Sequence, residues 1–175
     1  MGDMTMTERW DLYNGAGEKT DVTIFRGMPI PKGYYHLSVS AWIRNSKGQY
    51  LLSQRHPNKQ YPLLWECTGG SVLAGEDSLG GALREVKEEL GISLDPTGAE
   101  RLCHTRRDSV QDFYDVWQFH ADIELSEIRM QETEVVDVKW VYRDELLLMY
   151  EKGGLLHPLL TFQSELSALY QFYLG

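Results

Sequence analysis

The segment from Gly70 to Ile92, GSVLAGEDSLGGALREVKEELGI, restricts the fold more than any other part of the chain. It opens on glycines and predicts a helix that starts at Asp77 or Ser78 and runs to about Leu90, before a glycine at the usual C-cap position. Apolar residues recur along it with a period of 3.6: Leu79, Ala82, Leu83, Val86 and Leu90. Such an amphipathic helix has to bury its apolar stripe against another layer of the fold.

Three carboxylates share one face of this predicted helix. Glu85, Glu88 and Glu89 stand at positions i, i+3 and i+4, which places them within about 100° of arc. Like charges at this spacing destabilise an isolated helix by roughly 0.2–0.5 kcal/mol, so a divalent cation that neutralises them is expected. An all-oxygen ligand set favours a hard ion, Mg²⁺ with Mn²⁺ as a substitute, over zinc.

The rest of the chain predicts a mixed β-sheet covered by helices, an α/β fold. Strand patterns occur at 8–18 and 21–26, which form a predicted hairpin, at 34–43 and 49–55, which form a second, and at 63–68, 100–106, 112–123 and 134–142. Two further helices are predicted, one capped by Asp144 and ending near Lys152, and one from His157 to Tyr173.

Length and charge narrow the function classes. The 175 residues are enough for one domain with a real core. With 17 Lys and Arg against 26 Asp and Glu, the net charge of −9 disfavours nucleic acid or an anionic membrane as the main partner. A phosphorylated small molecule needs only local cations or a metal. The two cysteines fit a reducing compartment, and there is no run of 18 apolar residues, so a cytoplasmic protein is expected.

The segment 70–92 resembles the Nudix box, G-x5-E-x7-R-E-U-x-E-E-x-G-U, in which U is apolar. All of its fixed positions are matched, by Gly70, Glu76, Arg84, Glu85, Val86, Glu88, Glu89, Gly91 and Ile92. The resemblance implies the Nudix α/β/α sandwich with a mixed central sheet, built by a Nudix hydrolase domain at 34–175. An N-terminal β-hairpin extension, 1–33, would pack on this domain, which would end in a C-terminal helix. The resemblance also implies an activity, the hydrolysis of a nucleoside diphosphate linked to another moiety or of a related diphosphate.

The resemblance assigns roles to the residues of the box. Glu85 and Glu89 would bind the cation, Glu88 would assist as a ligand or as a base, and the carbonyl group of Gly70 would complete the ligand shell. In this family, the arginine that Arg84 matches orients the glutamates by salt bridges. Glu76 would have a similar structural role.

Cationic and acidic residues outside the box are further candidates. Arg55 and Lys59 precede it and are predicted to hold a substrate phosphate, with a solvated loop as the alternative. Glu132 and Glu134 lie at the entry of the predicted strand 134–142, and one of them is a candidate for a further metal ligand or the general base. We favour Glu132, which joins Glu88 as a candidate catalytic residue. The competing interpretation is two exposed acids at a strand entry.

A wider stretch, residues 10–145, resembles the isopentenyl-diphosphate-isomerase-like branch of Nudix proteins through YHL, QR-x3-K and W-x3-GG. The isomerase places its catalytic cysteine just before the glycine segment and lacks the helix glutamates. Cys67 lies two or three residues too early, and is predicted to be a buried packing residue. A Mg²⁺-dependent hydrolase is therefore the leading hypothesis, with the isomerase and a non-catalytic Nudix-fold ligand sensor as alternatives. Dimers are common in the family, which leaves a homodimer as an alternative to a monomer.

Overall fold

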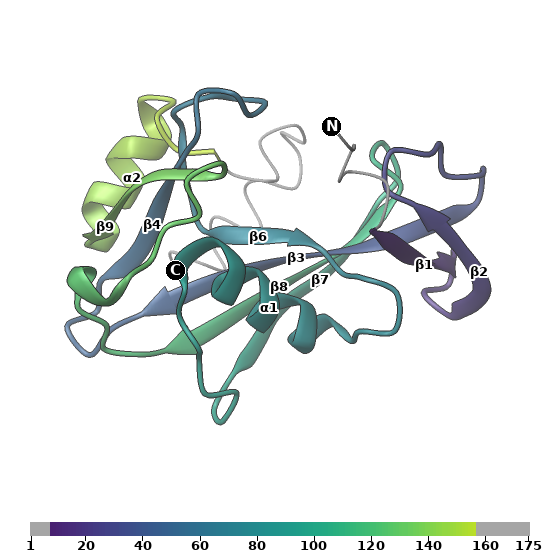
Figure 1. Ribbon diagram of the computed structural model, residues 1–175, viewed down its shortest axis with the longest axis horizontal. Coiled ribbons are helices and arrows are strands. Elements are labelled where there is room, and N and C mark those ends of the chain that lie inside the picture. The colour runs from purple at the N-terminus through teal and green to yellow at the C-terminus, as the bar shows by residue number, and fades with distance from the viewer. Residues whose placement is uncertain (1–7, 157–175) are drawn as a thin grey trace.

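The computed structural model describes residues 8–156, which form one nine-stranded mixed sheet with a helix on each side (Figure 1). The strands are β1 Arg9–Asn14, β2 Lys19–Phe25, β3 Tyr34–Arg44, β4 Tyr50–Arg55, β5 Trp65–Glu66, β6 Thr68–Ser71, β7 Glu100–Arg107, β8 Asp112–His120 and β9 Val135–Val141. The helices are α1 Ser78–Leu90 and α2 Arg143–Glu151, with a 3₁₀ turn at Leu125–Glu127. The predicted helix at 157–173 lies outside the described residues.

Strand β3 is the centre of the sheet. One edge pairs in parallel with β8 from His36 to Arg44, and the other pairs antiparallel with β6 from Ser38 to Ala41. The predicted hairpin of 34–43 with 49–55 is correct at its turn, but only Arg44 and Tyr50 pair between the two strands. Ser38–Ala41 on this edge of β3 pair with β6, and β4 pairs with β9 and β5 instead.

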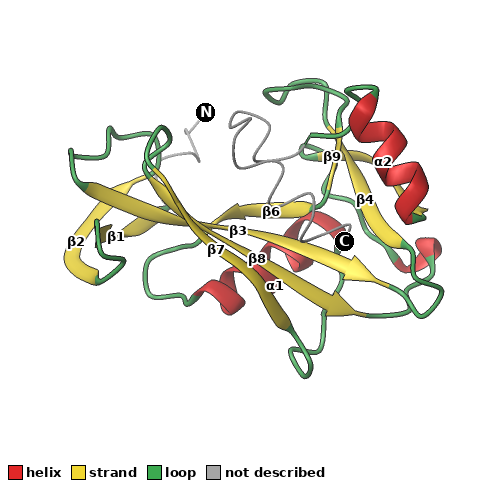
Figure 2. Ribbon diagram, turned by 180° about the vertical axis from the view of Figure 1, so that it is seen from behind, coloured by secondary structure: helices red, strands yellow, loops and turns green. Residues whose placement is uncertain are grey.

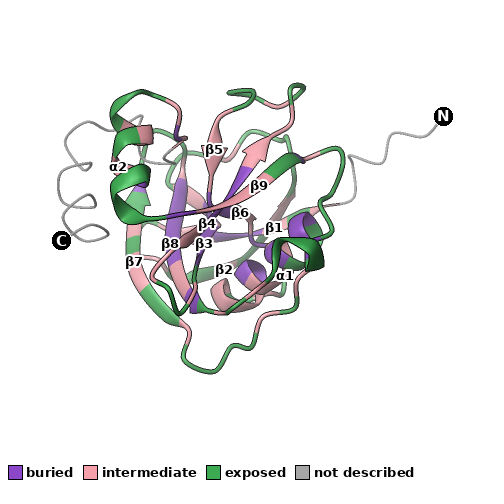
Figure 3. Cartoon of the chain, turned by 90° about the vertical axis from the view of Figure 1, so that its left-hand side faces the viewer, coloured by how far each residue is buried: buried purple, intermediate pink, exposed green. Residues whose placement is uncertain are grey.

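The alternation of side chains along β3 creates two cores. Leu37, Val39, Ala41 and Ile43 pack with the apolar stripe of α1, whereas Trp42 packs on the other face, in the cluster that contains Leu146 of α2. Figure 2 shows α1 behind the strands and α2 beside β4 and β9. In Figure 3 the buried segments follow β3, β8 and the sheet-facing side of α1. The predicted α/β sandwich with a mixed sheet is confirmed.

Helix α1 begins and ends where the sequence predicts. The Asp77 side chain accepts a hydrogen bond from the backbone amide of Gly80 at 2.7 Å, and Gly91 adopts a left-handed conformation with φ of 70°. The glycine at 81 also has a steric reason, because a Cβ atom there would lie 2.8 Å from Cγ2 of Val72. Local capping and tight packing on β6 therefore fix the register of the helix that carries the three glutamates.

We expect Asp77→Ala to lower the free energy of unfolding by about 1 kcal/mol, because the N-terminal amides of α1 lose their side-chain acceptor. Thermal unfolding measures this as a decrease in Tm of roughly 2–4 °C. Asp77→Ser retains an N-cap acceptor and should stay close to wild type. Equal losses in the two variants would contradict the capping role of this side chain.

The N-terminal hairpin is docked on the loop that precedes α1. Strands β1 and β2 pair antiparallel, and Tyr13 and Asn14 of β1 extend the sheet by pairing with β3. The amide of Ala74 donates to the carbonyl of Arg9, and the amide of Gly75 donates to the carboxylate of Asp11, both at 2.7 Å. A domain boundary at residue 33 stays a prediction.

Three predicted elements have different bounds in the structure. The predicted strand 63–68 is two short strands, and the second, β6, continues through Gly69 and Gly70. Glycine is unfavourable inside a strand. A Cβ atom at position 69, however, would lie 2.4 Å from the Val39 carbonyl oxygen, so the close approach of β3 requires glycine here. The strand from 112 ends at His120, and Tyr142 rather than Asp144 is the N-cap residue of α2. No helix within 8–156 is long and apolar enough to cross a membrane.

Candidate functional site

A cavity of about 280 Å³ lies between α1, β6 and the loop after β4. It is lined by Glu8, Arg26, Arg55, Lys59, Gly69, Gly70, Ser71, Glu85, Glu88, Glu89, Gln131 and Glu134. A second cavity of about 250 Å³ shares Arg55 and the β6 residues with it and extends over the sheet to Ser38, Ser40, Cys67 and Tyr114. The two together form a polar depression on the sheet, bordered by both acidic and basic side chains.

Glycine at position 70 allows Glu85 to reach the backbone of β6. A Cβ atom on Gly70 would lie 2.4 Å from both Cδ and Oε1 of Glu85. Distances below 3.0 Å are essentially never seen for real Cβ atoms, so any side chain here would displace the carboxylate. The first glycine of the box therefore has a steric role at the site.

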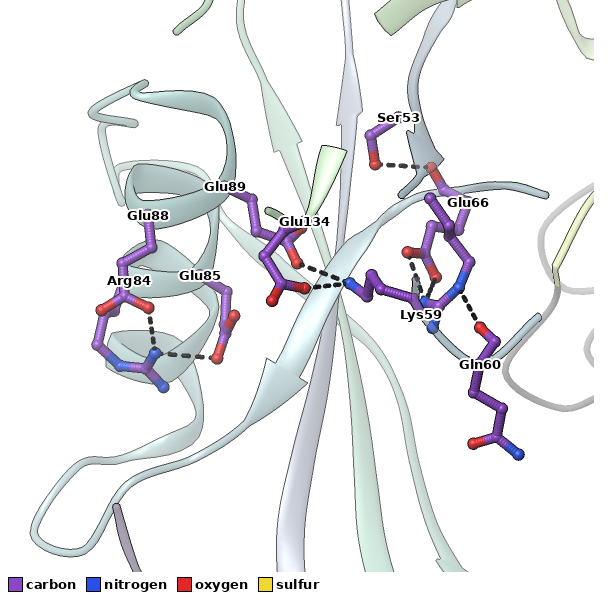
Figure 4. A network of polar contacts seen from close by, with 10 residues as sticks. Ser53, Lys59, Gln60, Glu66, Arg84, Glu85, Glu88, Glu89 and Glu134 are labelled. Atoms are coloured by element: carbon purple, nitrogen blue, oxygen red, sulfur yellow. Dashed lines mark hydrogen bonds and ion pairs between the residues drawn. The ribbon is translucent and has the colours of Figure 1, made fainter. Parts of the chain in front are cut away.

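Arg84 holds three of the acidic side chains of the box in place, and two of them, Glu85 and Glu88, are drawn in Figure 4. Its guanidinium group forms ion pairs with Glu76 at 2.8 Å, with Glu85 at 2.9 Å and with Glu88 at 3.0 Å. It also donates to the backbone carbonyl of Ser71 at 2.8 Å. One guanidinium group thus links α1 to the loop before it and to the end of β6.

Burial makes Glu85 and Glu89 costly to ionise. Glu89 is only 5% exposed, and burial raises its pKa to about 8, although the attraction of Lys59 opposes this shift. Burial also raises the pKa of Glu85, against the charge of Arg84. A cation bound beside these carboxylates compensates their buried charge, and it has to displace the proton that the raised pKa of Glu89 retains.

Lys59 and Arg55, the predicted phosphate-binding residues, line the cavity but already have carboxylate partners. The Lys59 ammonium lies 2.5 Å from Glu134 and 3.8 Å from Glu89 (Figure 4). Nη1 of Arg55 donates to both carboxylate oxygens of Glu66, at 2.7 and 2.8 Å, and its Nε donates to the carbonyl of Gln60.

The two acids before β9 lie in different places. Glu134 lines the cavity, whereas Glu132 is exposed and is not among the described residues that line it. The reason is a turn in which the amides of Glu134 and Val135 both donate to the carbonyl of Gln131. The Glu134 carbonyl in turn accepts from the amide of His56, which brings this residue beside the Lys59 loop.

The donor chemistry of the site fits a hard cation. Glu85, Glu88 and Glu89 supply carboxylate oxygens, and Gly70 leaves room for Glu85 at the backbone. Within 8–156, no three Asp, Glu, His or Cys side chains converge closely enough to hold a metal ion in this conformation. Arg84 and Lys59 pair with these carboxylates instead.

Cys67 is buried, as predicted. It is 4% exposed and packs in the cluster of Trp42, Tyr114 and Leu146. Burial raises the pKa of its thiol to about 12. The thiolate, which is the nucleophilic form, is therefore almost absent at neutral pH.

Comparisons with known proteins agree with the geometry of the site. The family model of the NUDIX domain matches residues 34–160. An uncharacterized Nudix hydrolase of Listeria monocytogenes is 36% identical over 148 residues, which cover 83% of this chain and 86% of that protein. An isopentenyl-diphosphate Delta-isomerase of Escherichia coli is 27% identical over 140 residues, 77% of this chain and 76% of the isomerase.

The similarity extends to a solved structure. The crystal structure of DR0079 from Deinococcus radiodurans superposes with a TM-score of 0.69 at 25% identity, and covers 85% of this chain and 91% of that one. The family match spans most of the chain and includes the helix whose carboxylates face the cavity. This chain is a member of the Nudix family.

Proposed function

We propose that the protein is a Mg²⁺-dependent hydrolase that cleaves the diphosphate linkage of a nucleoside-diphosphate-type or related small molecule. The observation that carries this proposal is that one cavity is lined by both carboxylates and cations. Carboxylates suit a divalent metal, and Lys or Arg suits phosphate oxygens. A diphosphate bound to a metal needs both in one place.

Glu85 and Glu89 would hold the metal, with Glu88 and the Gly70 carbonyl group as further ligands. When bound, the ion neutralises phosphate charge and lowers the pKa of water. Arg84 keeps Glu85 and Glu88 oriented through its two ion pairs.

Hydrolysis then needs an acceptor for a proton. A water oxygen attacks one phosphorus atom, the bond from that phosphorus to the bridging oxygen breaks, and the proton of the water passes to a carboxylate. Glu88 is one candidate for this base, and Glu134 replaces Glu132 as the other, because Glu134 lines the cavity.

The proposal is tested by phosphate release, coupled to a phosphatase, from dinucleoside polyphosphates, nucleotide sugars, ADP-ribose, NADH, CoA and nucleoside triphosphates. We expect turnover of one or more of these compounds with Mg²⁺ or Mn²⁺, and none with EDTA. Binding of these compounds without any turnover would instead support a ligand sensor.

An isomerase is the second candidate, because a relative with 27% identity carries that name. The buried thiol of Cys67 argues against it. If the protein is a hydrolase, Cys67→Ala should keep kcat within a few-fold of wild type and cost about 1 kcal/mol of stability, the low end for buried side-chain truncation.

The measurement compares phosphate release with isomerised product, detected by NMR from isopentenyl diphosphate. Cys103→Ala, at the partly buried second cysteine, is the matched control. A loss of 10²–10⁴-fold in Cys67→Ala alone, the usual contribution of a general acid or base, would instead support proton transfer by this thiol.

A further inference from the structure

The Lys59 side chain occupies a defined place among the acids of the cavity (Figure 4). It comes from the loop between β4 and β5 and is 21% exposed, while its ammonium contacts Glu134 and approaches Glu89. The loop is anchored at its start, where the amide of His56 donates to the carbonyl of Glu134 and the amide of Lys59 donates to the carbonyl of His56. Backbone contacts therefore place the lysine beside these two acids.

Lys59 differs from the other cations that line this cavity. Arg55 forms an ion pair with Glu66, and both side chains of that pair are 14% exposed. Arg26 is 59% exposed and pairs with Glu8 on the N-terminal hairpin. Of these three, Lys59 alone forms an ion pair with a glutamate of α1.

A lysine ammonium and a divalent metal ion compete for the same oxygen atoms. Both are attracted by the charges of Glu89 and Glu134, and they repel each other at short distance. The carboxylates do not converge on a metal position while Lys59 lies between two of them. Metal binding must therefore move the ammonium away from Glu89, within the same cavity.

We propose that Lys59, paired with Glu134, is an internal counter-ion that competes with the divalent metal for Glu89, and that metal binding releases its ammonium to the phosphates of the substrate. The proposal rests on the metal site of the proposed function. The exchange makes phosphate capture depend on metal loading, because the lysine is available to phosphate only after the metal has replaced it. It also releases Glu134 from its ion pair.

The test measures metal binding without substrate, by isothermal titration with Mg²⁺ and Mn²⁺. Lys59→Met removes the charge and keeps most of the length of the side chain, and we expect its metal dissociation constant to fall by about 10-fold, the effect of one partly buried charge contact. Its metal-free form should have a lower Tm, so the increase in Tm on adding metal should be larger than in wild type.

Arg26→Met is the matched control, since it removes a cation that lines the same cavity and is paired with Glu8 rather than with an α1 glutamate. We expect its metal affinity to stay within about 3-fold of wild type. A second titration uses inorganic pyrophosphate at saturating Mg²⁺. There Lys59→Met should bind about 10-fold more weakly than wild type, opposite in direction to its effect on the metal.

An unchanged or weaker metal affinity in Lys59→Met, or a gain equal to that of Arg26→Met, would overturn the exchange. So would a wild-type protein without measurable metal binding. Tighter metal binding in Lys59→Met, together with no phosphate release from any compound by wild type, would keep the exchange and refute the hydrolase. Phosphate release by wild type, together with unchanged metal affinity in Lys59→Met, would support the hydrolase and refute the exchange.

Discussion

Glu89→Gln is expected to lower metal-dependent phosphate release by about 10³-fold or more, which corresponds to about 4 kcal/mol of transition-state stabilisation. The substitution removes one charge from the proposed metal site and keeps nearly the same volume. Measurements at saturating Mg²⁺ compare kcat with that of Glu100→Gln, an exposed acid on β7. Wild-type turnover in Glu89→Gln would refute its assignment as a metal ligand.

The same substitution should stabilise the protein when EDTA is present. The pKa of Glu89 is raised from its ordinary value of 4.5 to about 8 by burial, so the unfolded chain ionises at a lower pH than the folded protein. Rising pH therefore favours unfolding of wild type between about pH 4.5 and pH 8, and the stability present at low pH is lost across this window.

Glutamine stays neutral throughout that window. We expect the Tm of Glu89→Gln in EDTA to exceed that of wild type by several degrees at pH 8, equivalent to about 1–3 kcal/mol, and to match it near pH 4. Thermal melts at both pH values provide the measurement. A Tm difference that is the same at pH 4 and pH 8 would show that burial of the charge is not its cause.

Gly70→Ala should reduce kcat by about 10²-fold, because a displacement of about 1 Å in a catalytic group has an effect of this size. The methyl group would lie 2.4 Å from the Glu85 carboxylate and force it off β6. Gly15→Ala is the matched control, since its nearest contact would be an ordinary 3.7 Å to Arg106.

Circular dichroism and metal titration separate the displacement from unfolding. We expect Gly70→Ala to keep its secondary structure and to bind Mg²⁺ more weakly, whereas Gly15→Ala should retain both properties. A Gly70→Ala protein with wild-type kcat and metal affinity would show that the carboxylate relocates without consequence, and the steric role of this glycine would be wrong.

Helix α1 could be predicted from sequence because its signals are local. The cap at Asp77, the apolar stripe and the glycine at 91 all lie within one segment, and the structure confirms each of them. The functional roles of its glutamates stay predictions, but the structure places all three at one cavity.

Glu8 and Arg26, which sequence reasoning missed, are positioned by tertiary contacts, and so is Glu134, which it ranked below Glu132. Glu8 and Arg26 reach the cavity because β1 pairs with β3, and Glu134 does so because of a turn at Gln131. An acid two residues away, Glu132, has the same chemistry, and only the turn distinguishes them. The predicted strand 63–68 stopped before Gly69 and Gly70 for a related reason. The residues that explain these glycines, Val39 and Glu85, are distant from them in sequence.

The parallel pairing of β3 with β8 has a kinetic consequence. Residues 36–44 find their partners at 112–120, so the centre of the sheet closes only after a long intervening chain, which contains all of α1, has been made. Loop closure of this kind is slow, because its entropy is lost before any contact is gained. Helix α1 can form early from its local signals, whereas the sheet on which its apolar stripe packs is complete only after β8 has been made. During synthesis this stripe is therefore exposed until the sheet closes, and an exposed apolar surface of this kind makes the unfinished chain prone to aggregate.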